Sequence, residues 1–339
     1  MTAKKVILDL DNAMGMPARD PDDGLALALA LVSPEIDLLG CTTCAGNCHT
    51  IESTANTVRM LAILERSTLP VAPGREQPFL RDRSAHFNYL SAKAEGAASR
   101  LWGTPARPKK PDVHETAPKA HEFIIEHVRT HPGQVNIVCT GSLTNLALAM
   151  LTAPEIIPDI HRVVHMGGAF VAPAGSKFIH HWRTPDIPDE VWRNTLRFNT
   201  HFDPEASAVV FRSGVSLTLV PVNVTQTVFL RQGDLEVLNS LETPFHQFIY
   251  ENTRPWITWS ETVRQLPGAH MHDPLALAVL IDPLMYRFDK MTVDVEAFLS
   301  GGFPWLKQCP GACRADVAVE ADIERFERFL PRRLSAPLP

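Results

Sequence analysis

The sequence predicts an α/β fold in which an open, mostly parallel central sheet is flanked by helices. Short apolar runs with the composition of buried strands alternate with segments that carry apolar residues at helical spacing. Several of these runs end in polar residues, as expected where parallel strands reach a common edge of a sheet. No part of the 339 residues has the composition of a clean domain linker, so we expect one large domain over 1–339.

The expected strands are short and apolar, and most are followed by an expected helix. The strands are assigned to Val6–Leu8, Ile36–Thr43, Val135–Cys139, Arg162–Met166 and Val215–Val222. The helices are assigned to 24–32, Ile51–Glu65 and the segment after Asn145 through Met150. Long proline-bearing loops near 72–118 and 171–195 are expected on the pocket side, because long ordered loops in α/β domains usually carry function.

The charge balance and the cysteines exclude some classes of partner. Lys and Arg total 32 and Asp and Glu total 38, so the net charge of -6 argues against nucleic-acid binding. The most apolar run, 25–32, is far shorter than the roughly 18–20 residues of a membrane span, so no membrane partner is expected. A chain of this size does not need disulfides, so its six cysteines predict a reducing, cytoplasmic location.

Five aspartates stand within the first 23 residues: Asp9, Asp11, Asp20, Asp22 and Asp23. Crowded carboxylates repel one another unless they are protonated or neutralised by a cation. Oxygen ligands of this kind select Ca²⁺ or Mg²⁺. Helix capping accounts for one of the pair before the 24–32 helix, but not for all five. An aspartyl phosphatase with Asp9 or Asp11 as nucleophile is an alternative that does not predict the adjacent pair.

Three further polar junctions follow expected strands or precede expected helices: 42–47, 139–145 and 271–275. Taken singly, each is explained by a turn or a helix cap. In an open α/β sheet, however, the carboxyl ends of the strands form one crevice where ligands bind. We therefore expect these junctions and the aspartates to meet in one site.

The chain resembles the inosine-uridine preferring nucleoside hydrolase family in several segments that occur in the family's order over nearly the whole chain. These are DLDNAMGMPARDPDDGLALALAL (9–31), GCTTCAGNCHTIESTANTVRML (40–61), LPVAPG (69–74), CTGSLTNLALAM (139–150), VVHMGGAF (163–170), RFNTHFDPEAS (197–207) and HDPLALAVLIDP (272–283). The resemblance implies a hydrolase that cleaves the N-glycosidic bond of a ribonucleoside with water, releasing base and ribose. It also implies Ca²⁺ at the bottom of the pocket and a homodimer or homotetramer.

Site roles follow from the resemblance, residue by residue. The implied metal ligands are Asp11, Asp23, the backbone carbonyl of Thr140, and Asp273. Asp22 would contact ribose hydroxyls and the attacking water, Asn47 and Asn199 would hold the sugar, and His272 would lie near the leaving base as a candidate acid. A cation can orient a water and lower its pKa while an Asp accepts the proton. Asp11 is the first choice for that base and Asp22 the second.

The sequence departs from the family pattern in three places. Residues 12–20 separate Asp11 from the Asp22–Asp23 pair, Arg197 stands where Glu is common, and 171–195 forms a long connection. Arg suits phosphate or carboxylate, so one alternative substrate is a 5′-phosphorylated nucleoside, a modified nucleoside or another N-glycoside. Another alternative is a non-catalytic nucleoside- or ribose-binding protein, which the full set of site residues argues against.

Two local patterns have competing interpretations. Trp256 and Trp259 could stack on a purine or pack in the core. The Cys41, Cys44 and Cys48 spacing with His49 could bind zinc, but buried core thiols are the more common reason for such cysteines.

Overall fold

The computed structural model describes residues 2–95, 101–102, 118–169, 198–293, 295, 299, 306–307 and 314–338. Within these residues nine strands form one sheet in the order β10–β9–β11–β6–β5–β4–β1–β2–β3. The strands are β1 (Lys4–Leu10), β2 (Ile36–Thr43), β3 (Val71–Pro73), β4 (Val135–Cys139), β5 (Ile160–Met166), β6 (Leu217–Val220), β9 (Tyr286–Val293), β10 (Leu306–Lys307) and β11 (Arg314–Ala321). All neighbours pair in parallel except β9, which runs antiparallel to β10 and β11.

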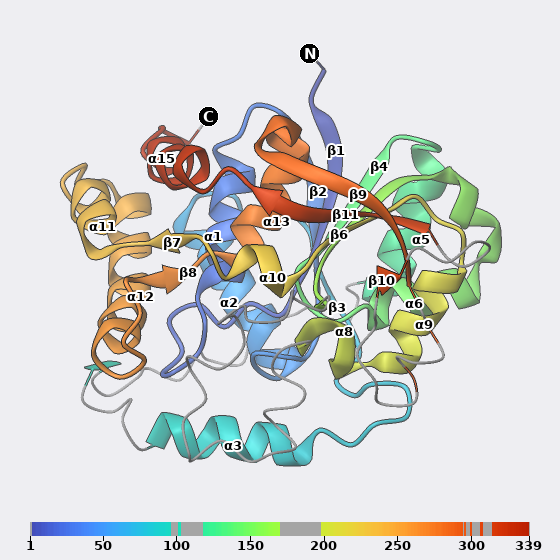
Figure 1. Ribbon diagram of the computed structural model, residues 1–339, viewed down its shortest axis with the longest axis horizontal. Helices are drawn as coiled ribbons and strands as arrows, with labels where there is room; N and C mark the ends of the chain where they lie inside the picture. The colour runs from blue at the N-terminus through green and yellow to red at the C-terminus, as the bar shows by residue number, and fades with distance from the viewer. Residues whose placement is uncertain are drawn as a thin grey trace.

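Helices cover both faces of this sheet (Figure 1). The α-helices are α1 (Asp22–Leu31), α2 (Thr50–Ile63), α3 (Ser84–Glu95), α5 (Ala120–Thr130), α6 (Thr144–Thr152), α8 (Phe198–Phe202), α9 (Pro204–Arg212), α10 (Val222–Thr225), α11 (Gln232–Asn239), α12 (Pro244–Thr262), α13 (His272–Ile281) and α15 (Ile323–Leu334). Two 3-10 turns lie at Pro154–Asp159 and Pro283–Met285. A short antiparallel ribbon joins β7 (Phe229–Leu230) and β8 (Ala269–His270).

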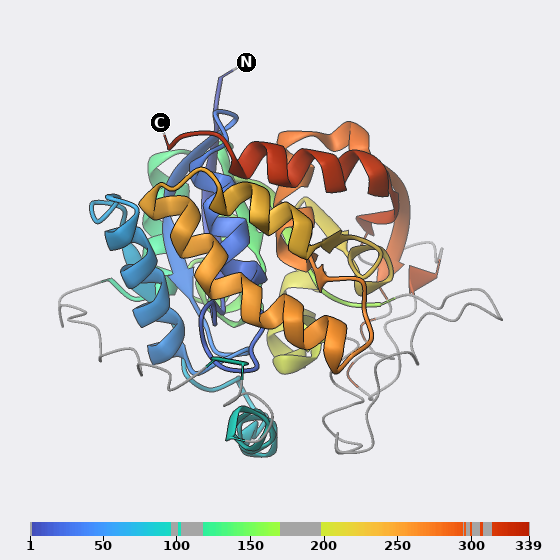
Figure 2. The same ribbon diagram turned by 90° about the vertical axis from the view of Figure 1, so that its left-hand side faces the viewer.

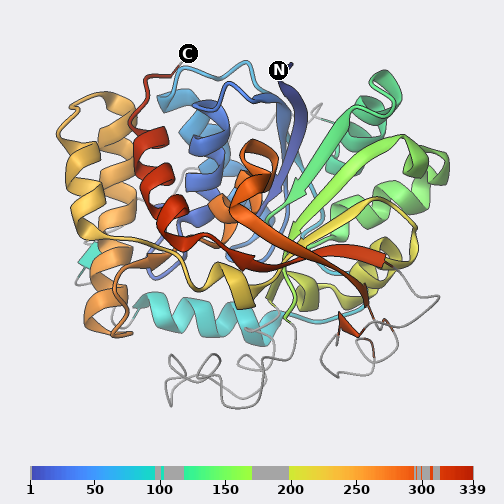
Figure 3. The same ribbon diagram turned by 45° about the horizontal axis from the view of Figure 1, so that its top comes forward.

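The hydrophobic core has two layers, one on each face of the sheet. The apolar side chains of β1 pack into both, because successive strand residues point to opposite faces. Val6, Leu8 and Leu10 pack in the layer that contains α1, α2, α13 and α15. Ile7 packs in the layer of α5, α6 and α9. Figure 2 shows α11 and α12 stacked outside the first layer, and Figures 1 and 3 show α3 beyond the carboxyl ends of the strands. α3 therefore lies on the side of the sheet where the parallel strands end.

The fold class predicted from the sequence is confirmed: the sheet is open, mostly parallel and flanked by helices. The expected strands at Ile36–Thr43 and Val135–Cys139 have the observed bounds. The expected strand through Val222 is too long, because β6 ends at Val220 and Val222 begins α10 after Pro221. The loop expected near 72–118 is wrong for Ser84–Glu95, which forms α3. The loop at 171–195 lies outside the described residues.

No helix among the described residues combines the length and the apolar character needed to span a membrane.

Candidate active site

The carboxyl end of β1 carries two buried aspartates with different partners. Asp9 Oδ1 accepts hydrogen bonds from Thr42 Oγ1 (2.6 Å) and Asn145 Nδ2 (2.8 Å), so it joins β1 to β2 and α6. Burial raises the pKa of Asp9 to about 6. Asp11 lies one residue beyond the strand, where its carboxylate can face the space between the strand ends. Asp9 therefore connects the sheet, and Asp11 belongs to the site.

Asp11 is held by a tight turn after β2. Its carboxylate accepts hydrogen bonds from the Asn47 backbone N–H (2.7 Å) and from Asn47 Nδ2 (3.2 Å). A Cβ atom at Gly46 would lie 1.8 Å from Asp11 Oδ2, so only glycine permits this approach. Burial, followed by the nearby charge of Asp23, raises the pKa of Asp11 well above its usual value. The turn thus places Asn47, which the sequence assigns to the same site, in direct contact with Asp11.

Asp22 and Asp23 form the first turn of α1. The N-cap position is Pro21, which makes no side-chain cap bond, so neither aspartate caps the helix. Asp23 Oδ1 accepts hydrogen bonds from the Asp11 backbone N–H (3.1 Å) and from Thr140 Oγ1 (2.8 Å). Asp22 Oδ2 accepts one from the Asp273 backbone N–H (3.2 Å) at the start of α13. Two helix starts and one strand end therefore converge.

One carboxylate oxygen from each of Asp22, Asp23 and Asp273 lies within 4.8 Å of the other two, and all three side chains are buried. Asp11 adjoins this group through Asp23. We call Asp11, Asp22, Asp23 and Asp273 the acidic cluster. Burial, followed by neighbouring carboxylates, raises the pKa of Asp22 and Asp273. Among the described residues, no Lys or Arg forms an ion pair with any of the four.

The donor set of the acidic cluster fits a hard divalent cation. All its side-chain donors are oxygens, and buried carboxylates without a counter-ion are costly unless a cation neutralises them. Asn199 adds an unmatched acceptor nearby. Its Nδ2 donates to the backbone carbonyls of Thr140 and Met166, the latter at 3.0 Å, whereas its buried Oδ1 has no hydrogen-bond partner. An ion or a sugar hydroxyl would satisfy the groups that the protein leaves open.

His272 begins α13 at the edge of the acidic cluster. Its Nδ1 lies 2.6 Å from Thr225 Oγ1, and its ring lies 5.1 Å from that of His270. Burial, followed by the charge of Arg264, lowers the pKa of His272 to about 3. His272 is therefore neutral near pH 7 and can exchange hydrogen bonds with a ligand through its other ring nitrogen.

The segment 12–20 is buried or partly buried and is anchored at both ends. Its first residue is anchored to α2, because the Asn12 carbonyl accepts a hydrogen bond from Asn56 Nδ2 (3.0 Å). At its other end, Arg19 donates to the Leu90 carbonyl of α3 (2.5 Å). Burial raises the pKa of Asp22, and the neighbouring charge of Asp20 raises it further. Asp20 is one of the five aspartates that the sequence predicts to meet in one site.

The structure decides between the competing interpretations of two other patterns. Trp256 and Trp259 stack on each other, with ring centroids 4.9 Å apart and only 4% and 8% of their surfaces exposed, which favours core packing. The described cysteines are buried free thiols at 41, 44, 48 and 139, and none belongs to a metal-ligating group of the described residues. Arg197, together with the cysteines at 309 and 313, lies outside the described residues.

The model of the family described as "Inosine-uridine preferring nucleoside hydrolase" matches residues 6–328. The chain belongs to this family. It is 30% identical to the pyrimidine-specific ribonucleoside hydrolase RihA of Salmonella arizonae, with 98% of each chain covered. It is 28% identical to probable uridine nucleosidase 2 of Arabidopsis thaliana over 86% of this chain and 82% of that one.

Solved structures of nucleoside hydrolases share the fold over the whole chain. The plant nucleoside hydrolase PpNRh1 superposes with a TM-score of 0.76 at 27% identity, covering 98% of this chain and 99% of that one. A purine-preferring ribonucleoside hydrolase from Gardnerella vaginalis gives 0.77 at 28% identity, with 98% of each chain covered. The protein is thus an N-glycosyl hydrolase with nucleoside hydrolase activity, from a metal-dependent family.

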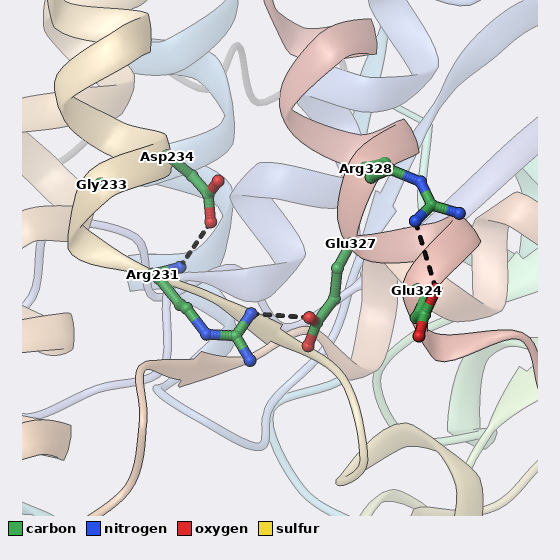
Figure 4. A pocket seen from close by; sticks show the side chains of 6 residues that line it. All are labelled: Arg231, Gly233, Asp234, Glu324, Glu327 and Arg328. Carbon is green, nitrogen blue, oxygen red and sulfur yellow. Dashed lines mark hydrogen bonds and ion pairs between the residues drawn. The ribbon is translucent and has the colours of Figure 1, made fainter.

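A second concave region lies apart from the acidic cluster. A cavity of about 420 Å³ lies between the start of α11 and α15, and Figure 4 shows the residues that line it. We call it the charged cavity; its lining residues are Arg231, Gly233, Asp234, Glu324, Glu327 and Arg328. Two of its three carboxylates are paired with arginines: Arg231 pairs with Glu327 at 2.6 Å and Arg328 with Glu324 at 3.3 Å.

Proposed function

We propose that this chain hydrolyses the N-glycosidic bond of a ribonucleoside with the help of a Ca²⁺ ion. The ligands would be Asp11, Asp23, Asp273 and the backbone carbonyl of Thr140. When bound, the ion neutralises the buried carboxylates and polarises the ribose hydroxyls and the attacking water. The observation that carries the proposal is the convergence of Asp11, Asp22, Asp23 and Asp273, four buried carboxylates, at the carboxyl ends of the strands.

Other residues of the site would bind the sugar, accept the proton of the attacking water and contact the leaving base. Asn47 would hold the ribose from the β2 side, and the unpaired Oδ1 of Asn199 would accept from a hydroxyl on the other side. Asp11 is our choice for the base that takes the proton of the attacking water, because Asn47 and the turn after β2 hold its carboxylate beside Asp23. Asp22 is the second choice. Neutral His272 would lie beside the leaving base as a hydrogen-bonding group.

The test is release of free base and reducing sugar from a panel of nucleosides, with and without a chelator. We expect turnover with added Ca²⁺ and its loss in chelator. Asp11→Ala should lower kcat by about 10²–10⁴-fold, the contribution of a general base. Activity of Asp11→Ala near that of the wild type would refute the assigned site. Tight nucleoside binding without hydrolysis would favour the non-catalytic alternative.

The panel should include nucleoside 5′-monophosphates, because Arg197 replaces the Glu that is common two residues before Asn199. An anionic 5′ group would pair with Arg197. Faster turnover of the monophosphate than of its nucleoside would support that substrate. Equal or better rates on the plain nucleoside would refute it.

We also propose a cytoplasmic homodimer or homotetramer. The four free thiols among the described residues are consistent with a reducing compartment. The oligomeric state follows from the family resemblance. Light scattering on the purified enzyme and fractionation of the source cells would test both statements; a monomer or an exported enzyme would contradict them.

A further inference from the structure

The peptide bond between Gly46 and Asn47 is hydrogen-bonded on both of its sides. Its N–H, which belongs to Asn47, donates to Asp11 Oδ2 at 2.7 Å. Its carbonyl, which belongs to Gly46, lies 3.0 Å from Nε2 of His86 in α3. Because a carbonyl oxygen can only accept, the histidine ring is the donor. The C=O and N–H of a trans peptide point in opposite directions, so the two bonds together fix the peptide plane.

The glycine at position 46 explains why a second bond is needed. A Cβ atom there would collide with Asp11 Oδ2, so the position must be glycine, and glycine leaves the backbone freer to rotate than any other residue does. A half-turn of the Gly46–Asn47 peptide would point its carbonyl at the carboxylate of Asp11 and its N–H away. The hydrogen bond from His86 opposes that rotation, because it holds the carbonyl on the side opposite Asp11.

Contacts on both sides of His86 hold the start of α3 in place. The ring of Phe87 stacks on that of His49, at the end of the turn, with centroids 4.1 Å apart. The same ring meets Phe202 of α8 edge-on at 6.0 Å. Arg83, just before α3, donates through Nε to the carbonyl of Phe202 at 2.8 Å. The imidazole of His86 is therefore presented to the turn by a segment that is itself anchored to the turn and to α8.

We propose that His86 is a positioning residue of the active site, which acts through the Gly46 carbonyl to hold the Asn47 N–H on Asp11. The inference rests on the proposed function, in which Asp11 binds the ion and accepts the water proton while Asn47 holds the ribose. Without the bond from His86 the peptide can rotate, so that Asp11 loses its shorter hydrogen bond and Asn47 moves. Misplacement of reacting groups by about 1 Å can lower a rate about 10²-fold.

A packing role of the imidazole is the competing explanation, because the ring of His86 also meets Phe87 and Phe202 edge-on, with centroids 5.5 and 6.0 Å apart. Two substitutions separate the roles. His86→Phe keeps an aromatic ring for packing but has no hydrogen-bond donor. His86→Gln loses the ring but keeps an N–H donor on a side chain of similar reach. A positioning role therefore predicts that Gln rescues what Phe loses, and a packing role predicts the reverse.

The experiment measures kcat on inosine and uridine, and Ca²⁺ affinity by calorimetry, for the wild type and both variants. His86→Phe should lower kcat by about 10–10²-fold and weaken Ca²⁺ binding by roughly tenfold, because Asp11 loses its fixed orientation. His86→Gln should stay within about threefold of the wild type in both measurements. The matched control is His127→Phe in α5. His127 also lies against a phenylalanine ring, that of Phe123 at 3.9 Å, and its Nδ1 is 2.9 Å from the carbonyl of that residue, so the variant should stay within about twofold.

Full activity and Ca²⁺ affinity in His86→Phe, or equal losses in the Phe and Gln variants, would overturn the role of His86 while leaving the proposed function intact. A wild type that binds Ca²⁺ but cleaves no nucleoside would overturn the proposed function. The calorimetric comparison would then still decide whether His86 orders Asp11. If His86→Phe does not fold, His86→Leu removes the same donor, with the same losses expected relative to His86→Gln.

Discussion

The acidic cluster and the charged cavity both gather carboxylates, but they balance them differently. In the charged cavity, Glu327 and Glu324 each pair with an arginine of this chain. In the acidic cluster, the carboxylates of Asp22, Asp23 and Asp273 are fully or almost fully buried, and no described Lys or Arg pairs with them. Both glutamates of the first arrangement thus have a counter-charge within the chain. The second is complete only with a cation from outside.

The difference shows which observation identifies a metal site. Acidic residues on a surface are common, and so are their ion pairs, which contribute little. Burial makes an unpaired carboxylate costly, so a protein that retains several together gains something from them. We therefore expect a bound cation to change the activity and stability of the acidic cluster and its variants, and to leave variants of the charged cavity unaffected.

Asp23→Asn should have the largest effect. Asp23 contacts both Thr140 and the Asp11 backbone, so its charge lies at the centre of the cluster. Its loss should weaken cation binding and lower kcat by roughly 10³-fold, several kcal/mol of transition-state stabilisation. Steady-state kinetics and calorimetric Ca²⁺ titration measure both effects. The matched control is Glu327→Gln in the charged cavity, and similar losses in the two variants would contradict the contrast.

Ca²⁺ should stabilise the folded wild type, because an ion that binds only the native state shifts the unfolding equilibrium. At a hundredfold excess over Kd the gain is ~2.7 kcal/mol, or a rise in Tm of roughly 3–8 °C. Asp23→Asn should lose most of this rise, and Glu327→Gln should keep it. Thermal melts in chelator and in Ca²⁺ provide the comparison; a Tm of the wild type that does not respond to Ca²⁺ would argue against the site.

Much of the fold could be predicted from the sequence, because the central strands are apolar and uniform. Ile36–Thr43 and Val135–Cys139 are buried between two helix layers, so their composition alone identifies them. β9 and β11 at the antiparallel end were not assigned, since they carry charged residues such as Asp289 and Glu320. Their pairing depends on distant partners, which a local pattern does not contain.

The candidate site divides in the same way. The aspartates and Asn47 stand in distinctive motifs, and the structure brings them together through backbone contacts. The contacts of Lys93 and Arg264 with Trp259 follow from no local motif, because the two residues are far apart in the sequence. The sequence leaves base stacking and core packing open for Trp256 and Trp259, and their mutual stacking favours core packing.

Asp273→Asn should change stability in opposite directions with and without the ion. In chelator, the amide removes a buried carboxylate whose pKa is raised by burial and then by the charge of Asp22. The variant should therefore be more stable than the wild type, with a free energy of unfolding ~1 kcal/mol higher. In saturating Ca²⁺ it should be less stable, because one ligand has lost its charge. Urea denaturation in the two conditions measures the reversal. A loss of stability both in chelator and in Ca²⁺ would show that the carboxylates of the cluster do not destabilise the cation-free fold.

Glu327→Gln should have a small effect of one sign under both conditions. The side chain accepts from Arg231 (2.6 Å) and from the Phe229 backbone N–H (3.0 Å), and only the first bond depends on its charge. Because the Arg231 side chain is 45% exposed and water partly screens the pair, we expect a loss of about 0.5–1 kcal/mol. Ca²⁺ should not alter this value. A Ca²⁺-dependent change would show that the charged cavity also responds to the ion.

Arg328→Gln should have the smallest effect and sets the baseline for the series. Arg328 and Glu324 form an i,i+4 pair on α15 at 3.3 Å, with side chains 73% and 84% exposed. Such pairs contribute about 0.3–0.5 kcal/mol and are screened by salt. The variant should therefore match the wild type in kcat. In urea denaturation at 0.5 M salt, where the Debye length lies between the roughly 10 Å of 0.1 M and the roughly 3 Å of 1 M salt, its free energy of unfolding should differ by less than this amount. A larger loss would mean that this pair supports the cavity more than its exposure indicates, and the contrast between paired and unpaired carboxylates would weaken accordingly.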